Sequence, residues 1–344
     1  MKLELTRRSL RLATPLQSSY GVVKERELLC IALTGPDDVP GYGEAAPLEP
    51  YDGVSVERVQ HALDAYRPVL ARSASFNGAQ MIEACREVDD LPQALAAVDM
   101  ALWDRAGRRE GKPVSALLSD GCAAQVPVNA TLSALDRAGV AEQAARAVDH
   151  GFDCLKVKVG VGDDAGRVAA ARAGAGPRAQ LRLDANGVWG VDEAIRAIDA
   201  LSPAGLELVE EPTHGLEQVR QVRERVAVRV AIDETAAQPG ALAAGVADAV
   251  CLKISRCGGI ARLLVAATLV RSTGAEVYLA STLDGPLGIA AAVHAAAALA
   301  SRGPLPHCGL ATLSLFSELD NPLPVRDGAI GVPRGPGLGV APLS

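Results

Sequence analysis

The segment Cys154-Leu155-Lys156-Val157-Lys158-Val159 alternates apolar and basic side chains over the length of one buried strand. Because side chains alternate across a strand, Lys156 and Lys158 share one face, and Leu155 and Val157 share the other. The apolar face suits packing against helices, so both ammonium groups are expected to point into a sheet that closes on itself. The stretch therefore predicts a barrel strand with two cations in the interior.

Short β-branched runs recur from about residue 126 and alternate with alanine-rich helical stretches. Their starts lie about 20 to 30 residues apart, which is the space that one strand, one loop and one helix need. An open doubly wound sheet is the alternative, but it is expected to carry a glycine-rich loop after its first strand, and Asn129-Ala130-Thr131-Leu132-Ser133 has no glycine. We therefore expect an α/β fold, a (β/α) barrel of the modified TIM type, with strands at 126–131, 154–159, 181–184, 206–210, 228–233, 249–254, 276–281 and 305–308.

The rest of the chain has the pattern of a second, α+β domain. Alternating strands are expected at 3–12 and 27–34, a glycine turn at 41–43, and helices from 55 to about 109. The Pro- and Gly-rich tail is too short to fold alone and is expected to pack back on this domain. The predicted organisation is a capping domain at 1–122, a catalytic barrel at 123–312, and a C-terminal segment at 313–344 that completes the cap.

Composition limits the classes of function. The chain has 344 residues, 49% of them hydrophobic, and a net charge of -7 with scattered basic residues, so we expect no nucleic-acid or membrane partner. The seven cysteines are odd in number and never form a C-x-x-C pair, which is typical of reduced thiols in a cytoplasm. No signal-peptide pattern opens the sequence, and the apolar run 289–300 is too short to span a membrane, so it is expected to form a buried helix.

Three carboxylates stand at the ends of consecutive predicted strands: Asp184, Glu210 and Asp233. Acids that converge on one barrel mouth repel one another unless a cation lies between them. One oxygen ligand from each strand, without His or Cys at matching positions, favours Mg²⁺ over Zn²⁺, with Mn²⁺ as an alternative. Each acid also has a structural explanation, since the aspartates suit helix caps and the strand phase decides whether Glu210 or Glu211 faces inward.

The lysines supply a candidate base. Two like charges close together lower the pKa of one of them, which would let a lysine accept a proton near neutral pH. The α-proton of a carboxylate is too weakly acidic for a lysine unless the developing enediolate is stabilised, and a divalent ion does this. The residues therefore indicate proton abstraction next to a substrate carboxylate.

Five ordered segments, with a sixth in the cap, resemble the signature of the enolase superfamily, muconate-lactonizing-enzyme subgroup. The resemblance covers nearly the whole chain and is specific because the segments occur in order: Gly41-Tyr42-Gly43-Glu44, Lys156-Val157-Lys158-Val159-Gly160, Leu183-Asp184-Ala185-Asn186, Val209-Glu210-Glu211-Pro212, Ile232-Asp233-Glu234, and Leu252-Lys253-Ile254 with Gly258-Gly259.

The resemblance implies a role for each matching residue. Lys158 is implied as the base on one face of the substrate, Lys253 as the opposite catalytic group, and Lys156 as the residue that tunes the lysine pKa. The implied metal ligands are Asp184, Glu210 and Asp233, and the residues expected to support them are Asn186, Glu211 and Glu234.

The same site serves lyases and isomerases in this subgroup. Residues 305–313 lack the Asp-x-Asp pair with which dipeptide epimerases hold an amino group, and 182–186 with Trp189, together with 309–313, are similar to o-succinylbenzoate synthases. The resemblance therefore favours elimination of water in menaquinone biosynthesis. An N-acylamino acid racemase, a dipeptide epimerase and, less favoured, a binding barrel without catalysis are the alternatives.

Substrate contacts are expected from the barrel mouth and the cap. Cap segments 14–22 and 47–53 are predicted to be mobile loops that close over the mouth. A small-molecule carboxylate is the expected partner, and a homo-oligomer is left open. The predicted substrate-binding residues are Tyr20, Ser281, Thr282, His307 and Gly309.

Overall fold

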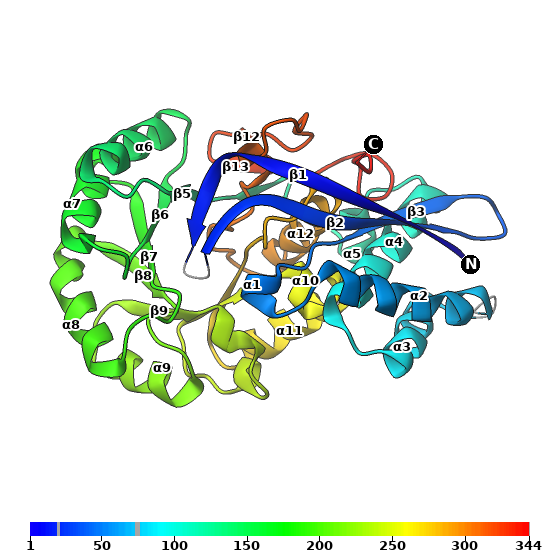
Figure 1. Cartoon of the computed structure of the whole chain (residues 1–344), viewed down its shortest axis with the longest axis horizontal. Coiled ribbons are helices and arrows are strands. Elements are labelled where there is room, and N and C mark those ends of the chain that lie inside the picture. The colour runs from blue at the N-terminus through cyan, green and yellow to red at the C-terminus, as the bar shows by residue number, and fades with distance from the viewer. Residues whose placement is uncertain (19–20, 73–75, 344) are drawn as a thin grey trace.

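The computed structural model describes residues 1–18, 21–72 and 76–343, which form a cap and a barrel (Figure 1). The cap begins with an antiparallel sheet in the order β1-β2-β3, in which β1 and β2 form a long ribbon that reaches from the cap toward the barrel. Its elements are β1 (Lys2–Ser18), β2 (Gly21–Thr34), β3 (Pro40–Ala45), α1 (Glu49–Asp52), α2 (Val56–Arg72), α3 (Gly78–Val88) and α4 (Pro92–Glu110).

Gly41 and Gly43 lie in strand β3 and not in a turn, which corrects the sequence prediction. A Cβ atom at Gly41 would lie 2.0 Å from the Ala101 carbonyl oxygen of α4, and one at Gly43 would lie 2.0 Å from that of Ala97. The glycines therefore serve close packing of a strand against a helix backbone, a use of glycine that sequence spacing does not distinguish from a turn.

The barrel contains seven parallel strands in the order β11-β10-β9-β8-β7-β6-β5. Helices lie outside the strands (Figure 1), and two short 3₁₀ turns replace a helix between β9 and β10. The strands are β5 (Ala130–Leu132), β6 (Cys154–Lys158), β7 (Gln180–Asp184), β8 (Leu206–Glu210), β9 (Arg229–Ile232), β10 (Ala249–Leu252) and β11 (Glu276–Leu279). The helical elements are α5 (Val114–Leu118), α6 (Arg137–Asp149), α7 (Asp164–Ala175), α8 (Val191–Leu201), η1 (Ser202–Ala204), α9 (Leu216–Arg223), η2 (Glu234–Ala237), η3 (Ala241–Ala243), α10 (Ile254–Cys257), α11 (Ile260–Ser272), α12 (Pro286–Ala300) and η4 (Leu313–Leu315).

The predicted first and eighth strands differ from the structure. Residues 125–127 form a separate strand, β4 (Gln125–Pro127), and the eighth strand is reduced to parallel bridges from Cys308 to Val128 and from Gly309 to Ala280. Pro304 and Pro306 precede these bridges and have no N–H to donate to a ladder, which explains the missing strand. The barrel still closes, because Cys308 N donates to the Pro127 carbonyl at 2.8 Å.

The C-terminal segment packs against both parts of the molecule. Its strands β12 (Val325–Arg326) and β13 (Ala329–Gly331) pair with each other, and β13 also pairs antiparallel with β4. Further along, Leu338 N donates to Asp104 Oδ1 of α4 at 2.7 Å. These contacts agree with a tail that packs on the cap, while the three domain boundaries stay a prediction.

Helix α12 contains the apolar run that was expected to be buried, and it is enclosed except at its C-terminal end. His294 at its centre is fully buried: Ser115 N donates to its Nδ1 at 3.1 Å, and its Nε2 lies 3.2 Å from the Leu338 carbonyl. No helix in the described ranges is long and apolar enough to cross a membrane. All seven cysteines are free thiols, as the sequence predicts.

We predict that His294 makes the protein less stable in mild acid. Burial lowers its pKa to about 4, from an ordinary value of 6.5. The unfolded chain therefore binds the extra proton first, and the free energy of unfolding falls as the pH drops from about 6.5 toward 4, by about 2 kcal/mol between pH 7 and pH 5. Urea denaturation of the His294→Gln variant should show a flatter pH dependence, although the variant is less stable at pH 7.

The exposed His150, at the end of α6, provides the control. His150→Gln should retain the wild-type pH dependence. If His294→Gln also retained the full slope, the loss of stability in acid would have to come from other groups.

Candidate active site

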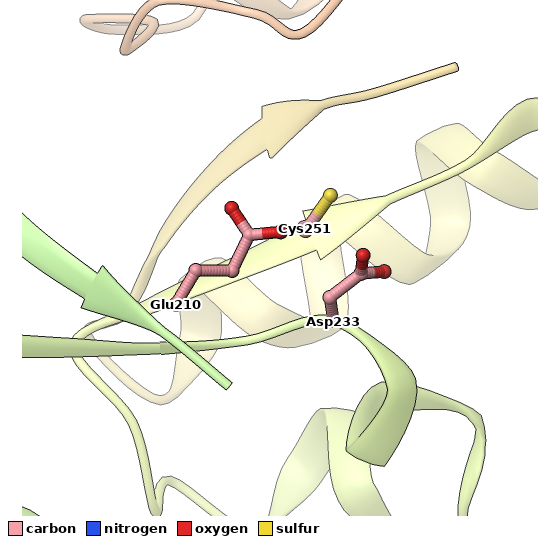
Figure 2. A group of neighbouring side chains, drawn as sticks. All are labelled: Glu210, Asp233 and Cys251. Carbon is pink, nitrogen blue, oxygen red and sulfur yellow. The ribbon is translucent and has the colours of Figure 1, made fainter. Parts of the chain in front are cut away.

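The three predicted metal ligands meet at the barrel mouth. Asp184 and Glu210 end the adjacent strands β7 and β8 and are paired across them, and Asp233 follows β9. All three are buried. Figure 2 shows the side chains of Glu210, Asp233 and Cys251 of β10 next to one another. One donor atom from each of Glu210, Asp233 and Cys251 lies within 4.8 Å of the other two, and Asp184 is not part of this closest group.

Lys156 and Lys158 share the inner face of β6, as their spacing predicts. Lys156 Nζ lies 3.0 Å from Asp184 Oδ2 and 2.8 Å from Glu210 Oε1. Lys158 Nζ lies 3.6 Å from Asp184 Oδ2 and donates to Asn186 Oδ1 at 2.6 Å. The two ammonium groups therefore stand on one side of the carboxylates.

Lys253 stands on the other side, at the end of β10. Its ammonium pairs with Asp233 Oδ1 and lies 5.1 Å from the centre of the Tyr51 ring, which the cap supplies. The Tyr51 hydroxyl donates to Asp233 Oδ1 at 3.0 Å and accepts from Arg256 at 2.7 Å. Sequence reasoning missed Tyr51, although it lies in the cap segment 47–53 that was expected to face the mouth.

The lysine charges are controlled by the acids. Burial alone would lower the pKa of Lys156, but Asp184, Glu210 and Asp233 outweigh it and raise that pKa well above its usual value. The same competition, led by Asp233, raises the pKa of Lys253. Lys156 is therefore the protonated member of the pair, and the expectation that one of the two lysines serves as a neutral base stays a prediction.

A cavity of about 420 Å³ opens above these groups, and Lys158 and Lys253 both line it. Ser281, Thr282 and Gly309 also lie in its wall, and their contact with substrate stays a prediction. Its lining includes residues that sequence reasoning missed. Of these, Thr131 ends the first predicted strand and Ser133 follows it, so both could have been found by the rule that sites gather at strand ends. The other polar members are Asn129, Gln143, Thr312 and Ser314.

One predicted substrate contact, His307, lies away from the cavity, and another, Tyr20, cannot be placed. His307 Nε2 lies 2.7 Å from Asp153 Oδ1, just before the start of β6, so its ring sits at the opposite end of the barrel from the cavity. Its place beside the predicted eighth strand was misjudged because that strand is not formed. Tyr20 lies outside the described residues.

The two cap segments that were predicted as loops contain regular structure. Residues 14–18 continue strand β1, and 49–52 form the short helix α1. Both segments still face the site, since Thr14, Pro15, Leu16, Leu48 and Tyr51 line the cavity.

Glu211 organises the backbone around the acids. Its buried carboxylate accepts hydrogen bonds from Asp233 N at 2.7 Å and from Thr235 N at 2.9 Å. Glu211 has φ 41° and Asn186 has φ 45°, in the left-handed region that non-glycine residues rarely adopt. Strained backbone on the loops after β7 and β8 is typical of a functional site.

Asn186 and Glu234 form a second supporting pair. Asn186 Nδ2 donates to Glu234 Oε1 at 3.0 Å, which orients the amide oxygen toward Lys158. Burial, together with Asp233 and Asp184, raises the pKa of Glu234 to about 8. Its Oε2 atom is buried without a hydrogen-bond partner.

The donor set fits a divalent metal ion. Cys251 corrects the expectation that no cysteine occupies a matching position: it lies two residues before Lys253 on β10, and alternation along the strand turns both side chains inward. Burial and Asp233 raise the pKa of its thiol well above the usual value. A neutral thiol is a poor ligand, so the carboxylates remain the donors and a hard ion such as Mg²⁺ suits them.

Known proteins share both parts of this architecture. Residues 139–343 match the family model described as "Enolase C-terminal domain-like", and 2–119 match "Mandelate racemase / muconate lactonizing enzyme, N-terminal domain". Muconate cycloisomerase 1 of Rhodococcus opacus is 33% identical over 91% of this chain and 88% of its own length. The o-succinylbenzoate synthase of Thermobifida fusca is 39% identical over 61% of this chain and 67% of its own.

A solved structure is similar to this chain over the whole fold. The dipeptide epimerase of Enterococcus faecalis, complexed with Mg and the dipeptide L-Leu-L-Tyr, superimposes with a TM-score of 0.90 at 26% identity and covers 98% of both chains. A cycloisomerase, a synthase and an epimerase are thus all similar to this chain, and similarity alone does not choose among their reactions.

We predict that Glu211 controls metal affinity without binding the ion. In Glu211→Gln one end of the carboxylate is replaced by an N–H donor, so one of the hydrogen bonds from Asp233 N and Thr235 N is lost and the loop that carries Asp233 is held less firmly. The loss of such a partner typically weakens metal binding about 10- to 100-fold. Isothermal titration calorimetry with Mg²⁺ measures this change.

Glu217→Gln is the matched control, because Glu217 forms an exposed ion pair with Arg220 on α9. Its Mg²⁺ affinity should equal that of the wild type. Wild-type affinity in Glu211→Gln would show that the Asp233 loop holds its position without this carboxylate.

Proposed function

The chain belongs to the mandelate racemase / muconate lactonizing enzyme family of the enolase superfamily, and on this basis we propose that it removes the proton next to a substrate carboxylate with the help of Mg²⁺. The observation that carries the proposal is the opposition of Lys158 and Lys253 across one cavity, with Asp184, Glu210 and Asp233 between them.

The proposed mechanism begins with binding of the substrate carboxylate beside the acids. A divalent ion held by Asp184, Glu210 and Asp233 supplies the positive charge that an enediolate requires. Lys158 Nζ accepts the α-proton, and its hydrogen bond to Asn186 aims it at the cavity. Lys156 stays protonated between Asp184 and Glu210 and holds both carboxylates in place.

Lys253 acts from the opposite face in this proposal. Its pKa is raised by Asp233, so it remains an ammonium that stabilises the enediolate electrostatically. The Tyr51 ring covers it from the cap side, which limits the access of water to the ammonium. The intact pair of opposed lysines argues against a barrel that only binds its ligand.

Within this chemistry we favour elimination of a β-hydroxyl group by an o-succinylbenzoate synthase. Support comes from the 39% identity to the T. fusca enzyme and from the charge of the cavity wall. Among the described residues that line the cavity, only Asp184 and Asp233 are acidic, and both are engaged by lysines. The ammonium group of a dipeptide would find no free carboxylate there.

Racemisation of an N-acylamino acid is the second candidate. The placement of Lys253 favours it, because an ammonium opposite Lys158 can return a proton to the other face of the enediolate. An N-acylamino acid also carries no free ammonium group, which agrees with a cavity wall whose described acids, Asp184 and Asp233, are both engaged by lysines.

The assay that tests the proposed activity combines the purified protein, Mg²⁺ and the cyclohexadiene precursor of o-succinylbenzoate. Dehydration creates an aromatic ring, so we expect a rise in ultraviolet absorbance that EDTA abolishes and added Mg²⁺ restores. No turnover, together with exchange of the α-proton of N-succinyl amino acids in D₂O, would replace the synthase proposal by racemisation. Full activity after removal of the metal would refute the metal's role.

We predict that Lys158→Ala lowers kcat by about 10²- to 10⁴-fold, the usual contribution of a positioned general base. Loss of the base should also abolish exchange of the substrate α-proton in D₂O, which NMR measures directly. Lys112→Ala, in an exposed ion pair with Glu110, is the control and should keep the wild-type rate. Near-normal turnover of Lys158→Ala would rule out Lys158 as the base.

A further inference from the structure

Glu44 of the cap reaches into the barrel domain and contacts the start of helix α12. Its carboxylate is 1% exposed, and Oε1 accepts a hydrogen bond from Gly285 N at 2.6 Å. The fit is close, because a Cβ atom at Gly285 would lie 2.4 Å from Glu44 Oε2. Gly285, the residue that precedes α12, offers no side chain of its own to cap this helix.

The loop that precedes α12 forms part of the cavity wall. Asp284 is buried and accepts from Thr282 N at 3.0 Å and from Thr282 Oγ1 at 3.1 Å, while Asp284 N donates to Ser281 Oγ at 3.0 Å. Ser281 and Thr282 are cavity residues. Glu44 therefore holds the residue next to a hydrogen-bonded loop that faces the substrate.

Asp99 makes the equivalent contact to helix α11. It lies on α4 of the cap, is buried, and accepts from Ile260 N at 2.6 Å. A Cβ atom at Gly259 would lie 2.4 Å from Asp99 Oδ2. The short helix α10 joins this point to Lys253, since Gly259 N donates to the Ile254 carbonyl and Cys257 N donates to that of Lys253.

Two other barrel helices, α6 and α7, are capped by a local acid, whereas α8 and α9 have no side-chain cap. Asp136 and Asp163, each directly before its helix, cap α6 and α7 by accepting from Gly139 N and Gly166 N. For α11 and α12 the acid comes instead from the cap domain. These two helices are the ones that follow the strand ends carrying Lys253 and Ser281.

We propose that Glu44 and Asp99 are positioning residues through which the cap fixes the two halves of the site: Glu44 sets the Ser281–Asp284 loop that faces the substrate, and Asp99 sets the backbone that carries Lys253. Loss of Glu44 weakens substrate binding, and loss of Asp99 slows the chemical step. The kinetic part of this inference rests on the proposed function, whereas the structural part does not.

The test compares three buried cap acids in the full-length protein: Glu44→Ala, Asp99→Ala and, as matched control, Asp104→Ala. Asp104 is equally buried, but its carboxylate accepts from Tyr42 N, Leu338 N and Arg108 Nε and makes no hydrogen bond to 281–288 or 254–263. Amide hydrogen exchange read by mass spectrometry follows 281–288 and 254–263, and steady-state kinetics with the precursor give KM and kcat.

For Glu44→Ala we expect about tenfold faster exchange in 281–288 and about tenfold higher KM with little change in kcat, the effect of one lost buried hydrogen bond. For Asp99→Ala we expect faster exchange in 254–263 and about tenfold lower kcat with little change in KM. Asp104→Ala should leave both loops and both constants at wild-type values. Glu44→Gln and Asp99→Asn keep an acceptor and should recover most of each loss.

The proposal is overturned if neither loop changes its exchange, or if all three alanine variants lose KM and kcat alike. If an alanine variant does not fold, Gly285→Ala perturbs the Glu44 contact from the barrel side and should reproduce the faster exchange in 281–288; wild-type exchange there would overturn the proposal. A wild-type protein that does not turn over the precursor contradicts the proposed activity, and the exchange experiment still decides the structural part.

Discussion

Repulsion among buried carboxylates is the constraint on which the site depends. Asp184, Glu210 and Asp233 are brought together by three neighbouring strands, and their charges are balanced by Lys156 and Lys253 at hydrogen-bond distance. Neither the three acids nor the two lysines would be stable in a buried position without the other group, since an unpaired buried charge is costly. The acids raise the pKa of Lys156 and Lys253, and the lysines lower the pKa of Asp184 and Asp233 against the effect of burial, whereas burial raises the pKa of Glu210. A substrate carboxylate that enters this cluster adds a negative charge to it. The ion pairs of the cluster can therefore respond to the ligand.

The cap contributes side chains to the site and does not only cover it. It supplies Tyr51 to the Asp233–Lys253 pair and provides acids to the helices after β10 and β11. The barrel supplies the charged groups, while the cap determines how precisely some of them are held. A change in the cap can therefore alter the site without any change in the barrel residues that carry the charges.

The sequence alone predicted the barrel, the cap and the convergence of three acids and three lysines, because strand alternation and strand-end position are local properties. It did not predict contacts that depend on the path of the chain. Tyr51 reaches the site from the cap, and His307 pairs with Asp153 at the other end of the barrel. Cys251 could have been found from strand alternation, because it lies two residues before Lys253. The sequence argument for the lysine pair weighed one like charge and left out the nearer carboxylates, which raise the pKa of Lys156.

The shortened eighth strand has a consequence for motion in the barrel. On one side of the ring, neighbouring strands are joined by regular ladders, whereas Cys308 and Gly309 join β11 to the start of the barrel through two isolated bridges. Local opening costs least where fewest hydrogen bonds must break. The seam at Cys308 and Gly309 is thus one of the places where the ring can open at the least cost, as is the junction of β9 and β10, which pairs two residues of each strand. Gly309 also lines the cavity, so opening of this seam would change the shape of the cavity wall.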